Sequence, residues 1–212
     1  MLSRREEEKL RKEAAIIKEA EELFCINGFE HTSMNEIAQR AGYTKRTVYQ
    51  YFTCKEDLFF AVILKGYERL WAAVKESTGA CGTGFEKLRR AYFAFYTLYR
   101  EHPRLLALMG MTGLVKGKSE TLDLPYRRRF YEFDRRMFDG ICALFRAGQE
   151  DGSVRADIGT GYLMYAAVFS LTGFFHMLSV TGKAYLGVAD MDEDKFIETG
   201  LQLFLDSVKS VS

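Results

Sequence analysis

Proline is nearly missing from this chain, and its scarcity constrains the fold. Only Pro103 and Pro125 occur among 212 residues, so long helices need not be interrupted. Residues with high helix propensity dominate, and no repeats and no convincing alternation of apolar and polar residues are present. The composition predicts a mostly α-helical protein, long enough for one large domain or for a small domain joined to a larger one.

The chain also lacks the residue patterns of metal centres and of disulfide-rich secreted proteins. Its cysteines are widely spaced and form no C-x-x-C pair, and its three histidines form no i,i+4 pair. No nucleophile–base constellation can be assembled from the sequence. We therefore expect no metal, no cofactor and no catalytic residues, and a reducing compartment is the simpler environment.

A strong net charge is missing as well. The formal charge is +1, so any surface that attracts a polyanion must be local. The first residues, MLSRREEEKLRKEAA, are highly charged where a secretory signal needs an apolar run. We expect a cytoplasmic protein.

One segment is long and apolar enough to span a bilayer. Residues 158–182 contain no formal charge apart from a possible one on His176. The segment nevertheless includes several serines, threonines and glycines, and no Lys/Arg cluster anchors either end. A helix that is apolar all round can equally be buried in a core or a subunit interface. We favour the buried helix and expect no membrane partner.

Hydrophobic periodicity and capping residues divide the N-terminal part into short helices. A helix over 5–26 ends at Asn27-Gly28, and Ser33 with Glu36 forms a capping box that starts the next helix. Gly42 ends that helix, and a third follows at about 44–52. Thr53-Cys54-Lys55-Glu56 resembles another capping box, which opens a long helix. Two short helices joined by a glycine turn and braced by a longer one describe a helix-turn-helix unit.

Helical periodicity continues to the C-terminus, and we expect further helices over 85–100, 103–115, 125–150, 158–182 and 193–209. The predicted domains are a helix-turn-helix domain over 1–56, a connecting helix over 57–76, and a C-terminal domain over 77–212. The G-L-V-K-G-K-S stretch at 113–119 has one residue too few for a phosphate-binding loop and is expected to form a polar turn.

The third predicted helix has two different faces. At 100° per residue, Val48 and Phe52 fall on one side, and Arg46 and Gln50 fall about 160° away. The first pair suits a core, whereas the second can hydrogen-bond to base edges, arginine to guanine and glutamine to adenine. No acidic residue occurs between Glu36 and Glu56, so the positive field is confined to this window. The alternative is a solvated face within an ordinary helical bundle.

Four motifs make this region familiar: A-x-x-L-F-x-x-x-G-F, T-S-M-x-x-I-A-x-x-A-G, T-V-Y-x-Y-F and K-E-D-L. Over about residues 14–63, without a gap, the chain resembles the N-terminal DNA-binding domain of the TetR family of bacterial transcriptional regulators. It departs from the family at Tyr43, where members often have a small apolar residue after the turn glycine.

The resemblance implies an all-α homodimer whose third helix enters the major groove of double-stranded DNA. By this likeness the phosphate contacts are Ser33, Thr44, Thr47, Tyr49, Tyr51 and Lys55. The base-reading residues are Lys45, Arg46 and Gln50. Beyond about residue 75 the resemblance is one of architecture and length. There it implies a ligand-binding domain whose last two helices form the dimer interface.

Two further sets of residues, in the C-terminal part, are candidates for an effector pocket and for the dimer interface. A pocket for a small apolar or amphipathic effector is predicted from Tyr92, Tyr96, Tyr99, Phe133, Asp134, Met137 and Phe169, although such aromatic stripes are more often core. Asp134 lies between apolar positions on its helix and could bind a cationic ligand, or could pair with a nearby arginine. The dimer interface is predicted from Gly161, Ala167, Ser170, Gly173, Phe196, Leu203, Phe204 and Val208.

These inferences indicate a ligand-responsive repressor that binds a pseudo-palindromic operator as a homodimer and is released by a small molecule. Activation instead of repression stays open. The competing classes are a ligand-independent architectural DNA binder and an enzyme that the N-terminal unit targets to DNA.

Overall fold

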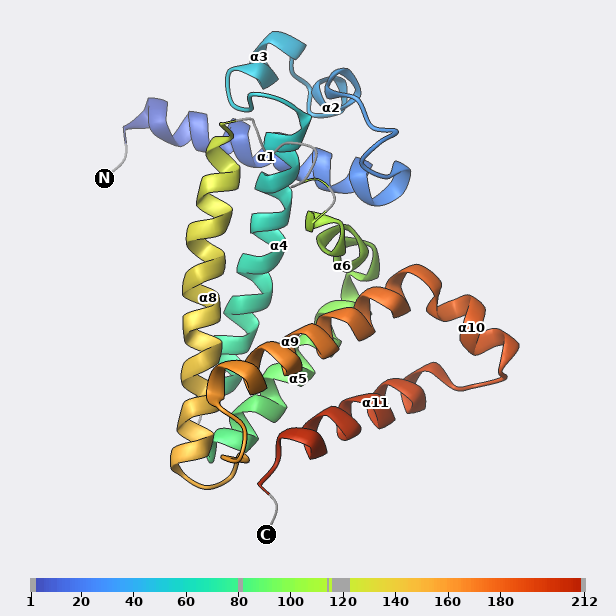
Figure 1. Ribbon diagram of the computed structural model, residues 1–212. Helices are drawn as coiled ribbons and strands as arrows, with labels where there is room; N and C mark the ends of the chain where they lie inside the picture. Colours follow the sequence, from blue (N-terminus) through green and yellow to red (C-terminus); the bar gives the residue numbers. More distant parts are fainter. Residues whose placement is uncertain (1–2, 80–81, 114, 116–122, 211–212) are drawn as a thin grey trace. The chain divides into compact units, whose positions relative to one another are not determined.

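The computed structural model describes residues 3–79, 82–113, 115 and 123–210, and the described chain is all-α (Figure 1). The predicted turn at 113–119 lies almost entirely outside these residues. An isolated antiparallel bridge joins Val154 to Lys209. The helices are α1 (Arg4–Asn27), α2 (Met34–Arg40), α3 (Lys45–Tyr49), α4 (Lys55–Thr78), α5 (Gly84–Glu101), α6 (Pro103–Gly110), α8 (Pro125–Glu150), α9 (Thr160–Met177), the π-helical turn η1 (Leu178–Gly182), α10 (Lys183–Val188) and α11 (Glu193–Val208).

The chain forms two compact units. Unit 1 comprises residues 1–67 and 108–133, and unit 2 comprises residues 68–107 and 134–212. Helices α4 and α8 each begin in unit 1 and end in unit 2. The first turns of α8 belong to unit 1 because Tyr126 and Phe130 pack against α1 and α4.

Unit 1 is built around α1. Ser3 caps this helix and forms the reciprocal capping box with Glu6, and Gly28 ends it with a φ of 82°. The buried stripe of α1 includes Phe24, whose ring lies 5.5 Å from Phe29 and 6.2 Å from Phe59. This aromatic cluster holds α1, the turn after it and α4 together.

The short helices α2 and α3 lie on one side of α1 (Figure 1). Ser33 and Glu36 form the predicted capping box of α2. The turn after α2 places Gly42 at a φ of 75°, a conformation that glycine adopts without strain. α3 is shorter than predicted, because Gln50 and Tyr51 donate to the carbonyls three residues earlier, at 3.1 and 3.0 Å, and so tighten the last turn.

Unit 2 contains a close crossing of α5 and α8. A Cβ on Gly84 would lie 2.2 Å from the Cα of Gly148, so the two backbones meet directly. The turn after α8 satisfies the first amides of α5, since Gly84 donates to Asp151 at 2.6 Å and Phe85 donates to the Ser153 hydroxyl at 3.0 Å. Hydrogen bonds from Ser153 and from the Gly84 amide lower the pKa of Asp151.

Helices α9 and α11 pack against each other and against α5 in unit 2 (Figure 1). Phe175 of α9 stacks on Phe95 at 5.6 Å, and Phe174 stacks on Phe196 of α11 at 5.6 Å. The predicted helix over 158–182 is α9 continued by η1. By length and composition the helical stretch Thr160–Gly182 could cross a membrane, but its buried face packs within unit 2.

Candidate nucleic-acid interface

The short helix α3 presents one buried and one exposed face, as its sequence predicts. Val48 and, just beyond the helix, Phe52 are fully buried and attach α3 to the core of unit 1. Lys45, Arg46 and Gln50 are exposed. The exposed face therefore carries donors and acceptors long enough to reach the base edges of a major groove.

The N-terminus of α3 is fixed by two threonines. Thr44 is the N-cap, and its hydroxyl accepts from the Thr47 amide at 3.2 Å. The hydroxyls of Thr44 and Thr47 are also 2.9 Å apart and share a hydrogen bond. Thr44 is exposed and Thr47 half-buried, so this pair sits where a phosphate oxygen can approach the start of the helix.

The positively charged side chains between Glu36 and Glu56, where the chain has no acidic residue, differ in their surroundings. Arg40 pairs with Glu19 and Glu22 of α1, at 3.1 and 2.7 Å. Lys45 instead extends over the ring of Tyr49, with 5.9 Å between the ammonium and the ring centroid. The free positive field of this face is thus concentrated on Lys45 and Arg46.

Lys55 is half-buried and bonded within unit 1. Its ammonium donates to the carbonyls of Phe29 and Glu30, at 2.8 and 3.2 Å, and lies 4.4 Å from the centroid of the Phe29 ring. The residue therefore braces the turn between α1 and α2. An ammonium has three donors, so one is left for a phosphate.

The remaining predicted phosphate contacts have different surroundings. Ser33 is exposed, and its hydrogen bonds, from the side chain and then from the amide, lower the pKa of Glu36. Tyr49 is 47% exposed, and Tyr51 is half-buried with its ring 6.4 Å from Phe52. Lys12 of α1, which sequence reasoning did not select, pairs with Glu8 at 2.7 Å, and this pairing raises the pKa of the lysine.

Two carboxylates and a tyrosine that sequence reasoning did not select meet in unit 1. Asp57 is fully buried and accepts from the backbone amides of Thr53, at 3.2 Å, and Tyr126, at 2.9 Å. The Tyr126 hydroxyl donates to Glu13 at 2.6 Å. No local pattern could reveal these contacts, because they join residues 69 and 113 positions apart.

The predicted pocket residues of unit 2 have divergent surroundings. Tyr92 is buried, and its hydroxyl has no hydrogen-bond partner within the described part of the chain. The hydroxyls of Tyr96 and Tyr99 donate to Asp194 and Glu193 of α11, at 2.9 and 2.6 Å. Phe169 is 70% exposed on α9 and so is not part of an interior pocket with Tyr92. Of the others, Met137 is buried, and Phe133 and Asp134 are half-buried.

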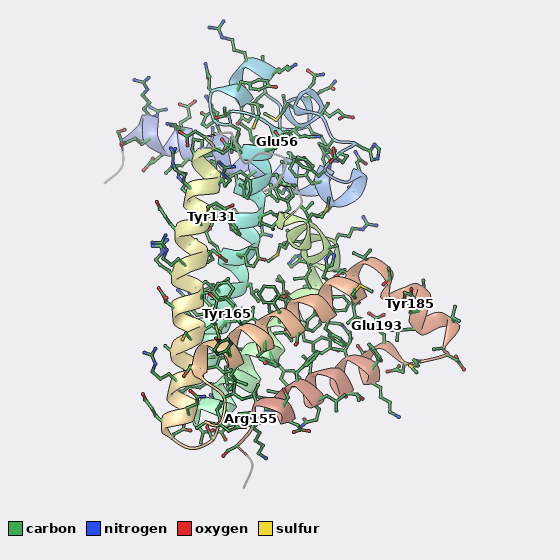
Figure 2. All side chains as sticks on the ribbon, in the orientation of Figure 1. Glu56, Tyr131, Arg155, Tyr165, Tyr185 and Glu193 are labelled. Carbon is green, nitrogen blue, oxygen red and sulfur yellow. The ribbon has the colours of Figure 1, made fainter. Side chains whose placement is uncertain are left out.

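The residues predicted for the dimer interface also differ from one another in their exposure to solvent. Gly161, Ser170, Gly173 and Leu203 are exposed, Phe196 is 37% exposed, and Phe204 is half-buried. Ala167 and Val208 are buried within unit 2, where the chain itself covers them. A groove of about 840 Å³ on the outer face of α9 is lined by Gly159, Thr160, Gly161, Tyr162, Tyr165, Ala166 and Phe169. Figure 2 labels Tyr165 on this helix.

Among the described residues, no group of three or more histidine, cysteine, aspartate or glutamate side chains could hold a metal ion. The feature that the fold does assemble is a helix-turn-helix with a polar, cationic exposed face. Fold and site define a helix-turn-helix unit of the kind that binds DNA.

A match to a known family covers the helix-turn-helix region. Residues 16–62 match the family model described as bacterial regulatory proteins, tetR family. This N-terminal segment is therefore similar to the DNA-binding part of tetR family regulators.

Curated relatives match over part of the chain. The chain is 34% identical over 77 residues to the HTH-type transcriptional activator FasR of Mycolicibacterium smegmatis, a match that covers 36% of this chain and 35% of FasR. It is 38% identical over 61 residues to the HTH-type transcriptional regulator UidR of Escherichia coli K12, which covers 29% and 31% of the two chains. The chain spans about a third of the length of the curated relatives it matches.

Solved structures share the fold over nearly the whole chain. A tetR family regulator from Shewanella sp. PV-4 has a TM-score of 0.69 at 20% identity, covering 94% of this chain and 99% of that one. The fatty acid degradation regulator FadR of Bacillus halodurans has a TM-score of 0.71 at 18% identity, covering 92% and 94%. At these identities the likeness concerns the fold alone.

Proposed function

We propose that this protein is a homodimeric, ligand-responsive repressor that binds a pseudo-palindromic operator. The observation that carries the proposal is the exposed face of α3, on which Lys45, Arg46 and Gln50 project while Val48 is buried beneath them. In this proposal α3 lies in the major groove, where the three side chains read base edges. Hydroxyl and ammonium groups around it hold the phosphates, namely those of Ser33, Thr44, Thr47, Tyr49, Tyr51 and Lys55.

Dimerisation is proposed through the outer face of α9 together with α11. The α9 groove combines small residues with exposed rings: beyond the helix's own backbone, no described residue lies within 4 Å of a Cβ placed on Gly161, while Tyr162 is 84% and Phe169 70% exposed. Gly173, further along α9, is equally open. A second copy related by a two-fold axis would place its rings against these small residues. Leu203 and Phe196 extend the same apolar surface along α11. The two α3 helices would then read half-sites one turn of DNA apart.

The effector is proposed to bind in unit 2. Tyr92 supports this, because a buried hydroxyl without a partner is costly and a ligand oxygen would satisfy it. Burial raises the pKa of Tyr92, so the phenol stays protonated and can donate. A small apolar or amphipathic molecule with one hydrogen-bonding group fits these surroundings.

Repression is the proposed direction of control, in a protein that acts in the cytoplasm, where its DNA lies. An effector that prefers a conformation with altered α3 spacing would release the operator. FasR is named as an activator, so the same DNA-binding chemistry also serves activation. A ligand-independent architectural binder would show no preference for one DNA sequence, and an enzyme would require a catalytic group beyond those described.

The test is selection of duplexes from a random DNA library, followed by binding of the Arg46→Ala variant. We expect a two-fold symmetric consensus and a loss of about 1–3 kcal/mol of discrimination at one position of each half-site. The exposed Arg136 of α8 supplies a matched control, since Arg136→Ala should leave the consensus unchanged. Selection that enriches no sequence would contradict the proposal and favour the architectural binder.

A further inference from the structure

The first turn of α8 is fastened to three parts of unit 1 through one residue, Tyr126. Its amide donates to Asp57 of α4 at 2.9 Å, and its hydroxyl donates to Glu13 of α1 at 2.6 Å. Its ring lies 5.4 Å from Phe52, the buried residue that follows α3. Tyr126 is itself 6% exposed, so these contacts are shielded from water.

The carboxylate of Asp57 holds two chain segments at once. It accepts from the Thr53 amide, next to the start of α4, and from the Tyr126 amide in the first turn of α8. Amides in the first turn of a helix have no partner within the helix, and a carboxylate is favourable there. Because Asp57 is fully buried, breaking either bond would leave a buried charge poorly satisfied.

Helix α8 does not end in unit 1. It has 26 residues, of which 134–150 belong to unit 2. Closer to Tyr126, Phe130 packs 5.8 Å from Phe60 and 5.6 Å from Tyr67, both of α4. The part of α8 in unit 1 is therefore held at its tip and along its side, while residues 134–150 belong to unit 2.

We propose that Tyr126 is the positioning residue through which α8 conveys the state of unit 2 to α3. A shift of α8 along its axis would displace the Tyr126 ring from Phe52 and strain its bonds to Glu13 and Asp57. Phe52 is joined directly to α3 on its buried side, since its amide donates to the Val48 carbonyl at 3.1 Å. The inference rests on the proposed function, because it concerns the coupling between DNA binding and unit 2.

Coupling free energy is reciprocal, so operator DNA can serve as the probe in place of an unidentified effector. If α8 conveys a signal to α3, then DNA bound at α3 must alter the stability of α8 in unit 2. Amide hydrogen exchange over residues 134–150, with and without the selected operator duplex, measures this change directly.

We expect operator binding to change exchange over 134–150 of the wild-type protein by about fivefold or more, the lower end of usual coupling. Tyr126→Phe keeps the ring on Phe52 and removes the bond to Glu13; it should still bind the duplex and lose most of this change. Tyr185→Phe on α10 is the matched control and should respond as the wild type does, since Tyr185 is 69% exposed. Figure 2 labels this residue.

Glu13→Ala removes the same hydrogen bond from the other side and guards against a local defect in the Tyr126 variant. We expect Glu13→Ala to lose the exchange response over 134–150 to the same extent as Tyr126→Phe. The double variant should lose no more of this response than either single variant. A wild-type response absent over 134–150, or retained in both variants, overturns the role of Tyr126 alone. Failure of the wild type to select any duplex overturns the proposed function as well.

Discussion

At the scale of single residues, the Lys55 ammonium holds the turn between α1 and α2 through the carbonyls of Phe29 and Glu30. The same group stands at the start of α4, where a DNA phosphate is proposed to bind. Two of its three donors are used within the protein, so both roles can be met together.

Lys55→Met tests both roles, because the methionine keeps an apolar chain over the Phe29 ring and removes the charge. We expect a loss of about 1–2 kcal/mol in stability, since charged hydrogen bonds to two carbonyls disappear. We also expect operator affinity to fall. The slope of log affinity against log salt concentration should decrease by about the contribution of one phosphate contact. Thermal unfolding and DNA titrations at several salt concentrations measure the two effects.

The control is Lys75→Met on the exposed last turn of α4, which should change neither stability nor operator affinity. An unaltered melting temperature for Lys55→Met would argue against the role of Lys55 in holding the turn between α1 and α2.

Residue roles could be predicted where the chemistry is local. The capping box of Ser33 and Glu36 and the opposed faces of α3 follow from spacings of three or four residues. The bonds of Asp57 could not be predicted in the same way. The sequence suggests a box between Thr53 and Glu56, whereas the Thr53 amide donates to Asp57, one residue later. The same carboxylate accepts from the Tyr126 amide of a distant segment, which no local pattern reveals.

At the scale of helices, the contact between α5 and α8 depends on two glycines. A Cβ on Gly84 would lie 2.2 Å from the Gly148 Cα, and a Cβ on Gly148 would lie 2.4 Å from a methyl group of Val154. The first obstacle is backbone, which cannot rotate away as a flexible side chain can. Helix boundaries were largely predictable, whereas this crossing was not, because periodicity identifies a buried face and not the helix that covers it.

Gly84→Ala should therefore destabilise unit 2. We expect overpacking to lower the free energy of unfolding by about 1–3 kcal/mol. The upper value fits better, because the obstacle is main chain. The single tryptophan, Trp71, lies in unit 2, so its fluorescence during urea unfolding reports on this unit. Gly187→Ala in α10 is the control: nothing lies within 4 Å of its added Cβ, and helix propensity favours the alanine. Equal midpoints for the two variants would show that the crossing tolerates a methyl group.

At the scale of the whole molecule, the apolar surface of α9 and α11 is more than a monomer needs. Within the uncharged Thr160–Gly182 stretch, Tyr162 is 84%, Phe169 70% and Met177 55% exposed, so large apolar side chains face outward. Large exposed apolar surfaces mark interaction sites. Hydropathy alone left a membrane span and a buried helix as alternatives; the packing of one face on α5 and α11 favours a protein partner for the other face.

Phe169→Glu should convert a dimer into monomers. Phe169 lies in the α9 groove and is 70% exposed, so a charge there should leave the fold of unit 2 intact while placing two carboxylates at a two-fold interface. We expect sedimentation equilibrium to give a dimer for the wild type and a monomer for the variant at micromolar concentration. The monomer should bind the palindromic operator far more weakly, because it holds one half-site at a time. Val188→Glu on α10, 91% exposed and outside the groove, should remain dimeric. A wild-type protein that stays monomeric and instead floats with phosphatidylcholine vesicles would assign this face to a membrane surface.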